Sequence, residues 1–239
     1  LLASGAYDST IRLWSMPTGA LQASISAKEF VRSVAFSPDG TSLATGDLIA
    51  RLWDLSRLDP VSAWQPESAP RSMVFRPGAG SLAVGAADGT VWQWDPHAAG
   101  SARRLTSVTG AVTALAATPG GKRMAAGTED GSVLLLETDS GRVLRRLRAH
   151  EATVTGLVFS PDGSLLASCS LAREGTTAAT LRLWDSDATS EPRRFEKQTN
   201  SLSAAVFSPD GTLLASAGAD RGITLWDLRS GECHRLAGH

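Results

Sequence analysis

The sequence contains little lysine and no long apolar run. Arginine supplies 20 of the 23 basic residues, 24 acidic residues offset them, and the formal net charge is -1. No apolar stretch approaches the roughly 20 residues that a membrane-spanning helix needs. A balanced charge also lacks the basic excess typical of nucleic-acid-binding proteins. We therefore expect neither a nucleic-acid nor a membrane partner. The excess of arginine over lysine is an indication of a GC-rich, bacterial genome.

Cysteine is also scarce. Cys169 and Cys233 are the only two, they lie far apart in the sequence, and they form no metal-ligand spacing. This usage favours two reduced thiols over a disulfide. We expect a cytoplasmic protein without a cofactor or a structural metal.

A unit of about forty residues occurs six times. Its first mark is the turn Ser-Pro-Asp-Gly, intact at residues 37–40, 160–163 and 208–211. Its second mark is the strand end Leu-Trp-Asp, at residues 52–54, 183–185 and 225–227, with altered copies at 13–15, 93–95 and 135–137. The tryptophan position recurs at intervals of 39, 41, 42, 48 and 42 residues. A repeat of this length is one supersecondary unit that cannot bury its apolar face alone.

Each unit has the pattern of four short strands. In the best-preserved copy, residues 154–159, 164–168, 180–184 and 192–196 are short, rich in β-branched or alternating apolar residues, and separated by turns. In Ser-Pro-Asp-Gly, proline presets the first turn corner and glycine accepts the last backbone conformation. Antiparallel four-stranded sheets repeated in this way are typical of a β-propeller.

On these motifs the whole chain resembles the WD-repeat (WD40) β-propeller family. The resemblance implies an all-β propeller of four-stranded antiparallel blades, five complete and one lacking its innermost strand, with 23 strands in total. We expect a single propeller domain or segment over 1–239, with blades at about 1–26, 27–65, 66–106, 107–148, 149–196 and 197–239. The chain begins in what matches the middle of a repeat, so we expect it to be a segment of a longer, bacterial multidomain protein.

The resemblance also implies a hydrogen-bonded tetrad in each blade, made of a histidine, a Ser or Thr, an aspartate and the strand-end tryptophan. No repeat contains all four. We interpret these residues as structural, because a catalytic Ser-His-Asp set is a single constellation and not a repeated one. The candidates are Ser4, Asp8, Trp14, Thr45, Asp47, Trp53, Asp88, Trp94, Asp130, His150, Ser168, Trp184, Ser216, Asp220 and Trp226.

Partner binding is expected at the loops that the family places on one face of its propellers. Exposed aromatic and arginine side chains there make good interface anchors. The candidates are Tyr7, Phe30, Arg32, Arg71, Glu129 and Arg173. The loop 171–179 is six residues longer than its counterpart in the sixth repeat, and it is either a binding element or a tolerated insertion.

Two further features have more than one interpretation. Trp92 takes the position that Arg12 and Arg182 hold in other repeats, and it either packs between blades or forms an exposed anchor. The arginines of the fourth strands protect exposed strand edges or form a basic rim for an acidic partner, and we favour edge protection because the net charge is near zero.

These observations favour a non-enzymatic scaffold for protein–protein interaction, acting as a regulatory or sensing region. The partner would be a protein, a peptide or a neighbouring domain of the same chain. The alternatives are a purely structural spacer, or an enzyme with a site at the propeller channel. The predicted first strands carry no carboxylates for acid–base chemistry, which disfavours the enzyme.

Overall fold

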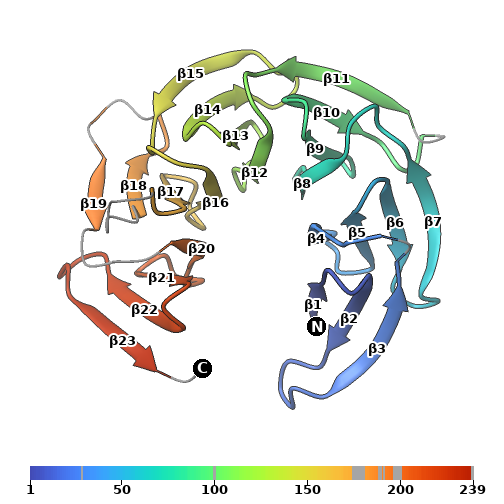
Figure 1. Cartoon of the computed structure of the whole chain (residues 1–239), viewed down its shortest axis with the longest axis horizontal. Coiled ribbons are helices and arrows are strands. Elements are labelled where there is room, and N and C mark those ends of the chain that lie inside the picture. Colours follow the sequence, from blue (N-terminus) through green and yellow to red (C-terminus); the bar gives the residue numbers. More distant parts are fainter. Residues whose placement is uncertain are drawn as a thin grey trace. The chain divides into compact units, whose positions relative to one another are not determined.

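The computed structural model describes residues 1–27, 29–98, 101–173, 181–187, 190, 192–195 and 201–237. The chain forms two compact units, Leu1–Val112 and Thr113–His239. All regular secondary structure in the described residues is β-strand. Each unit contains three antiparallel sheets, which we call blades 1 to 3 and blades 4 to 6 (Figure 1).

Unit 1 begins with the three-stranded blade. Blade 1 contains β1 (Leu2–Gly5), β2 (Thr10–Trp14) and β3 (Leu21–Ser26). Blade 2 contains β4 (Ser33–Phe36), β5 (Ser42–Gly46), β6 (Ala50–Asp54) and β7 (Asp59–Trp64). Blade 3 contains β8 (Pro70–Phe75), β9 (Leu82–Ala86), β10 (Thr90–Trp94) and β11 (Ala102–Ser107).

Unit 2 contains three blades of four strands. Blade 4 contains β12 (Val112–Ala117), β13 (Arg123–Thr128), β14 (Ser132–Glu137) and β15 (Val143–Arg148). Blade 5 contains β16 (Val154–Phe159), β17 (Leu165–Ser170), β18 (Leu181–Asp185) and β19 (Arg193–Phe195). Blade 6 contains β20 (Leu202–Phe207), β21 (Leu213–Gly218), β22 (Gly222–Asp227) and β23 (Cys233–Ala237).

The prediction of four-stranded antiparallel blades is confirmed for five sheets, and the sixth has three strands. Strand register shows which strand blade 1 lacks. Leu2 faces Trp14 across β1 and β2, just as Leu214 faces Trp226 across β21 and β22. The strands β1 to β3 therefore correspond to the second, third and fourth strands of the other blades.

The Ser-Pro-Asp-Gly turn is stabilised by its own side chains. Asp162 Oδ1 accepts hydrogen bonds from Ser160 Oγ at 2.5 Å and from the Ser164 backbone N–H at 3.0 Å, and Gly163 has φ 73°. The hydrogen bond from Ser160 is the largest contribution that lowers the pKa of Asp162 to about 2, followed by the bonds from Ser164. Asp39 accepts equivalent hydrogen bonds from Ser37 and Thr41, and Asp210 from Ser208 and Thr212. The pKa of each aspartate is likewise lowered to about 2.

The aspartate of Leu-Trp-Asp caps the turn after the third strand. Asp227 Oδ1 accepts hydrogen bonds from the backbone N–H groups of Arg229 and Ser230, both at 2.8 Å. Asp54 accepts from the Ser56 N–H at 2.7 Å in the same way. Local turn chemistry therefore accounts for both sequence marks.

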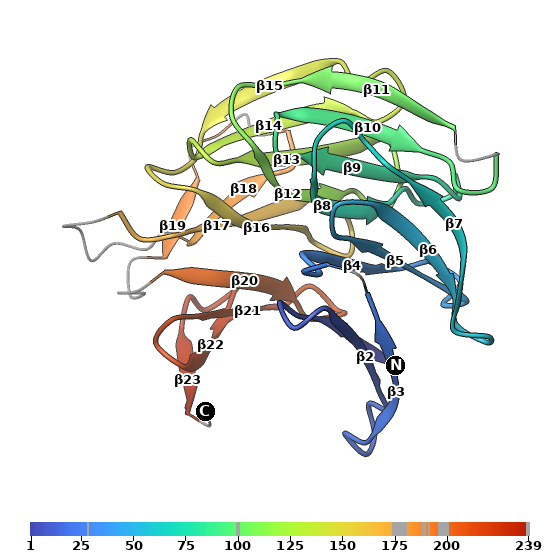
Figure 2. The ribbon, with the colours of Figure 1, turned by 45° about the vertical axis from the view of Figure 1, so that its right-hand side comes forward.

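The apolar core lies between consecutive blades. Ile11 and Leu13 of blade 1 pack with Leu43 and Trp53 of blade 2. In unit 2, Val133 and Leu135 of blade 4 belong to one cluster with residues of blade 5. Figures 1 and 2 show the first strands of neighbouring blades side by side, β4 with β8 in unit 1 and β16 with β20 in unit 2. No single repeat buries its apolar surface alone, as the repeat length predicts.

Trp92 packs between two blades. Its ring lies 5.4 Å from that of Trp64 at the end of β7, and its Nε1–H donates to Thr90 Oγ1 at 2.8 Å. Of the two interpretations of this side chain, the structure therefore supports packing. Neither cysteine is in a disulfide bond, and Cys169 is buried whereas Cys233 is partly buried.

Candidate partner-binding face

Four strand-end tryptophans donate an indole N–H to a hydroxyl on the neighbouring strand. Three of the four hydroxyl groups, those of Thr45, Ser168 and Ser216, belong to buried residues. The pairs are Trp14 with Ser4 at 3.0 Å, Trp53 with Thr45 at 2.8 Å, Trp184 with Ser168 at 3.0 Å and Trp226 with Ser216 at 3.0 Å. These bonds join the second strand to the third in blades 1, 2, 5 and 6.

Blade 5 extends this pair to a buried network of three residues. His150 Nε2 lies 2.7 Å from Ser168 Oγ, which also accepts the indole N–H of Trp184. Burial, with the nearby charge of Arg182, lowers the pKa of His150 to about 3. Ser168 is 0% exposed, so a substrate cannot reach its hydroxyl. This geometry supports a structural interpretation of all three residues.

The aspartates of the other predicted tetrads are bonded within their own turns. Each one accepts a hydrogen bond from the backbone N–H two residues later. The bonds are Thr10 to Asp8 at 3.0 Å, Ile49 to Asp47 at 2.6 Å, Thr90 to Asp88 at 2.9 Å, Ser132 to Asp130 at 3.0 Å and Gly222 to Asp220 at 3.4 Å. None of these bonds reaches a strand-end tryptophan or its hydroxyl partner.

Arginine side chains pair with three of these aspartates, and the sequence analysis did not identify them. Arg12 Nη2 lies 2.9 Å from Asp8, and Arg51 pairs with the buried carboxylate of Asp47. In both hairpins the arginine follows the aspartate by four residues, which is the signal that could have revealed the pair. In blade 6 the partner comes instead from the fourth strand, where Arg235 lies 3.0 Å from Asp220.

Blades 3 and 4 lack the hydroxyl partner in different ways. In blade 4, Ala126 and Leu136 replace both members of the pair, so neither position has a polar side-chain group that needs a partner. In blade 3, Val84 takes the hydroxyl position while Trp94 remains. The Nε1–H of Trp94 is buried and has no hydrogen-bond partner among the described residues.

We expect Val84→Thr to stabilise the protein by about 0.5–1 kcal/mol, because it offers Trp94 the acceptor that Thr45 gives Trp53. Thr is nearly isosteric with Val, so the change adds a hydroxyl without a cavity. Urea unfolding monitored by circular dichroism measures the gain. The matched control is Val84→Thr with Trp94→Phe, where the gain should disappear. An equal gain in both backgrounds would show that the indole N–H is not the cause.

Three of the six predicted partner-binding residues meet on the surface of unit 1, and we call them the aromatic cluster: Tyr7, Phe30 and Arg32. The Tyr7 and Phe30 rings lie 5.5 Å apart in an edge-to-face arrangement, and the Arg32 guanidinium carbon lies 5.9 Å from the centre of the Tyr7 ring. Tyr7 is 71% exposed and Phe30 is 49% exposed. Two aromatic side chains therefore contact each other while about half of the Phe30 surface and most of the Tyr7 surface face solvent.

The backbone holds this cluster in place from both sides. Val31 N–H donates to Ala6 O at 3.1 Å, and Arg32 N–H donates to Gly46 O at 2.9 Å. Gly5 lies against the Val31 side chain so closely that an added Cβ would meet it at 2.3 Å. The blade 1 turn and the segment entering blade 2 are thus held together by backbone contacts. These contacts fix the positions from which the Tyr7 and Phe30 side chains extend.

The other three candidates do not join the aromatic cluster. Arg71 is exposed near the start of β8 in unit 1. In unit 2, the exposed Glu129 accepts a hydrogen bond at its backbone carbonyl from Thr153, and Arg173 Nη1 lies 3.4 Å from Glu151. The remainder of the predicted 171–179 loop, residues 174–179, lies outside the described residues.

Within the described part of the chain, no group of three or more His, Cys, Asp or Glu side chains is placed to hold a metal ion. The same residues include no helix of the length and hydropathy that a membrane crossing requires. The aromatic cluster in unit 1 consists of two aromatic rings and a guanidinium group. These groups are suited to recognition of another protein surface.

A family model described as "WD domain, G-beta repeat" matches residues 1–15, 19–54, 102–135, 141–185 and 190–227. These segments cover more than half of the chain. The matched residues include four of the five strand-end tryptophans, Trp14, Trp53, Trp184 and Trp226, which are the four that donate to a hydroxyl.

Proposed function

Because the chain belongs to the WD domain, G-beta repeat family, whose propellers generally mediate protein–protein interaction, we propose that it is a non-enzymatic scaffold that binds a protein or peptide through the aromatic cluster. The observation that carries the proposal is the contact between two exposed aromatic residues, Tyr7 and Phe30, beside the guanidinium of Arg32. Aromatic and arginine side chains dominate interface energetics.

The cluster defines the chemistry of the partner. Two adjoining rings offer apolar area at low entropic cost, and Arg32 adds a planar donor beside them. We propose a partner segment with an apolar side chain for the rings and a carboxylate for Arg32. We also propose that the chain is a regulatory or sensing region of a larger protein, and that binding of this partner is how it acts. The two thiols, neither of which is in a disulfide bond, support a reducing, cytoplasmic location for this activity.

A peptide library selected against the full chain tests the proposal. We expect Tyr7→Ala and Phe30→Ala each to weaken the selected peptides by about tenfold or more, since truncating an interface anchor costs at least about 1.4 kcal/mol. Fluorescence anisotropy measures each dissociation constant.

Met16→Ala is the matched control, because Met16 is also a mostly exposed apolar residue of blade 1 but follows β2, whereas Tyr7 precedes it. This variant should change affinity less than about twofold. A structural spacer would yield no selected peptides. Selected peptides that bind a folded Tyr7→Ala/Phe30→Ala variant as tightly as the wild type would refute the cluster as the docking site.

A further inference from the structure

Arg71 holds the same position in blade 3 that Arg32 holds in blade 2. Each arginine lies four residues before the phenylalanine that ends the first strand of its blade, Phe36 in β4 and Phe75 in β8. Figure 1 shows β4 and β8 as neighbouring first strands of unit 1. The two arginines therefore occupy equivalent positions of adjacent strands, and both side chains are exposed.

In unit 2 the same position holds a threonine that joins one blade to the next. Thr113 of blade 4 donates from Oγ1 to the Val154 carbonyl at 2.6 Å. Thr155 of blade 5 donates in the same way to the Leu202 carbonyl at 2.7 Å. In these two blades the position therefore has a structural use.

In unit 1 the connection between blades 2 and 3 is made by another residue. Ser33, which follows Arg32, accepts a hydrogen bond at its Oγ from the Met73 N–H at 3.0 Å. The arginine position is thus released from joining the strands. Its long, charged side chain needs another explanation.

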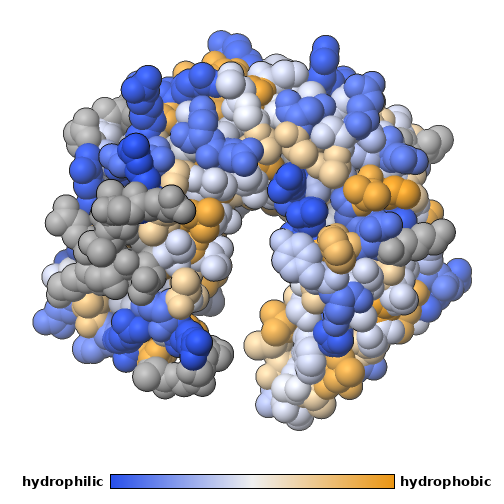
Figure 3. Space-filling view, viewed as in Figure 1, coloured by the Kyte–Doolittle hydropathy of each residue, from blue (hydrophilic) through white to orange (hydrophobic). Residues whose placement is uncertain are grey.

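A β-bulge sets the direction of Arg71. The pairing of β8 with β9 shifts its register between Pro70 and Ser72. Arg71 lies between these two residues and therefore faces no partner residue in β9. A bulge of this kind takes a side chain out of the regular alternation of its strand. Figure 3 shows hydrophilic surface over β8, with apolar surface beside it.

Neither guanidinium group has an ion-pair or hydrogen-bond partner among the described residues. Arg32 contacts the face of the Tyr7 ring, with its guanidinium carbon 5.9 Å from the ring centre. The turn carboxylate of blade 2 is already engaged, because Asp47 pairs with Arg51. Arg32 and Arg71 are therefore open to a carboxylate from outside the described chain.

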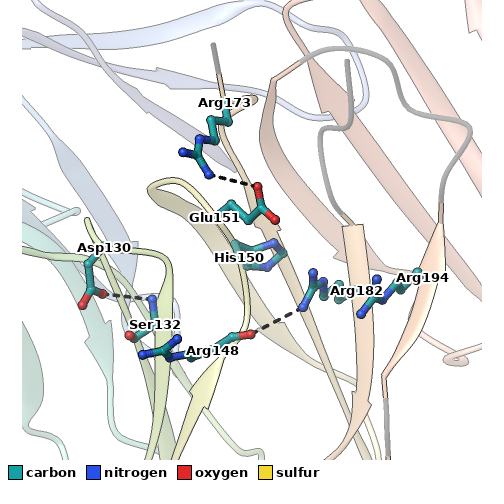
Figure 4. A pocket seen from close by; sticks show the side chains of 8 residues that line it. All are labelled: Asp130, Ser132, Arg148, His150, Glu151, Arg173, Arg182 and Arg194. Carbon is teal, nitrogen blue, oxygen red and sulfur yellow. Dashed lines mark hydrogen bonds and ion pairs between the residues drawn. The ribbon is translucent and has the colours of Figure 1, made fainter. Parts of the chain in front are cut away.

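Two arginines that line a cavity in unit 2 differ in this respect (Figure 4). Arg173 Nη1 lies 3.4 Å from the Glu151 carboxylate. Arg182 Nη1 donates to the Arg148 carbonyl at 3.5 Å. Both are engaged by the protein itself, unlike the two arginines of unit 1.

We propose that Arg32 and Arg71 each bind a carboxylate of one partner segment, so that the segment is acidic and extends from the aromatic cluster to the start of β8. This inference rests on the proposed function and adds a second charged contact to it, that of Arg71. The guanidinium fork fits a carboxylate in a bidentate manner. Because the two arginines lie on separate strands, they match two separate acidic side chains.

Selection of random peptides on the full chain and on its Arg71→Glu variant tests the inference. Peptides selected on the wild type should contain two acidic residues beside an apolar one. Arg71→Glu should exchange one of the acidic residues for a basic one and keep the rest of the pattern, since the aromatic cluster is unchanged.

Fluorescence anisotropy with a peptide selected on the wild type measures the contact itself. We expect Arg71→Gln to weaken binding by about fivefold, as loss of an exposed ion pair would. The same variant should cause no further loss once the matching acidic residue of the peptide is replaced by its amide. Added salt should weaken wild-type binding more than binding to Arg71→Gln, through screening.

Arg104→Gln is the matched control. It removes the same charge from an exposed arginine of blade 3, but from β11, at the opposite edge of that sheet from β8. This variant should leave the affinity unchanged.

The same acidic peptides on the wild type and on a folded Arg71→Glu variant would overturn this inference and leave the aromatic cluster as the docking site. Failure of the proposed function would look different. Either no peptide would be selected, or binding would survive Tyr7→Ala/Phe30→Ala, and the inference would fall with it.

Discussion

Replacing Gly131 with alanine is expected to destabilise the protein by about 3 kcal/mol. The added methyl group would collide with backbone atoms, which cannot move away by a change of rotamer as a side chain could. A Cβ at this position would lie 2.2 Å from the His150 carbonyl oxygen, 2.7 Å from its carbonyl carbon and 2.9 Å from the Ala152 carbonyl oxygen. The same two segments are joined by the hydrogen bond from His150 N–H to Gly131 O at 2.8 Å. Relief of the collision therefore requires this hydrogen bond to lengthen and the start of β14 to move away from the segment that contains His150 and Ala152.

Backbone conformation alone accounts for only part of this effect. Gly131 has φ 83°, but Ser9 and Arg221 follow the turn aspartates of blades 1 and 6 with φ 63° and 57°. Side chains at these positions show that the left-handed conformation is tolerated in such turns. The larger part of the cost at Gly131 is therefore expected from the contact with the His150 carbonyl.

Gly211→Ala separates the two contributions in urea unfolding. Gly211 has φ 71°, and a Cβ there would meet only Pro161 Cδ at 3.6 Å, an ordinary contact. We expect this control to lose about 1 kcal/mol, the cost of the left-handed conformation. Equal losses in the two variants would show that the carbonyl contact near Gly131 is easily relieved.

The repeat made the blades predictable because both of its marks act locally. Asp162 bonds to residues two positions away in Ser-Pro-Asp-Gly, and Asp227 caps the turn that follows it. Such contacts need no knowledge of the rest of the fold, so each copy predicts its own hairpin. The register of the strands then follows from turn length.

Contacts between repeats were not predictable from the same pattern. The turn position of Tyr7 indicated exposure, but its contact with Phe30 depends on how blade 1 meets the segment entering blade 2. Likewise, Trp92 packs on Trp64, which lies in the preceding blade. Repetition specifies the type of residue in each position but not the neighbour that it meets.

Acidification is expected to destabilise the protein through His150 in the range between pH 6.5 and pH 4.5. The pKa of His150 falls from 6.5 to about 3 on folding, because burial and the nearby Arg182 disfavour the charged ring. Below pH 6.5 His150 binds a proton in the unfolded chain but stays neutral in the folded chain. The free energy of unfolding therefore falls as the pH falls. The loss is about 1.4 kcal/mol per pH unit, or about 2.7 kcal/mol by pH 4.5.

The turn aspartates act in a separate range. The pKa values of Asp39, Asp162 and Asp210 are lowered from 3.8 to about 2. The stability that these carboxylates contribute is present above pH 3.8 and is lost only as the pH falls toward 2. Any loss between pH 6.5 and 4.5 therefore reflects groups other than these turns.

Urea unfolding at pH 7.5, 6.5, 5.5 and 4.5 measures this contribution when the wild type is compared with His150→Gln. The variant loses the hydrogen bond to Ser168 in its native geometry, so we expect it to be less stable at pH 7.5. Its stability should nevertheless fall less steeply than that of the wild type, so that the advantage of the wild type shrinks by about 2.7 kcal/mol by pH 4.5. His97→Gln is the matched control because His97 is exposed, and it should retain the wild-type slope. Parallel curves for the wild type and His150→Gln would mean that folding leaves the pKa of His150 unchanged, which is incompatible with a buried neutral ring between Ser168 and Arg182.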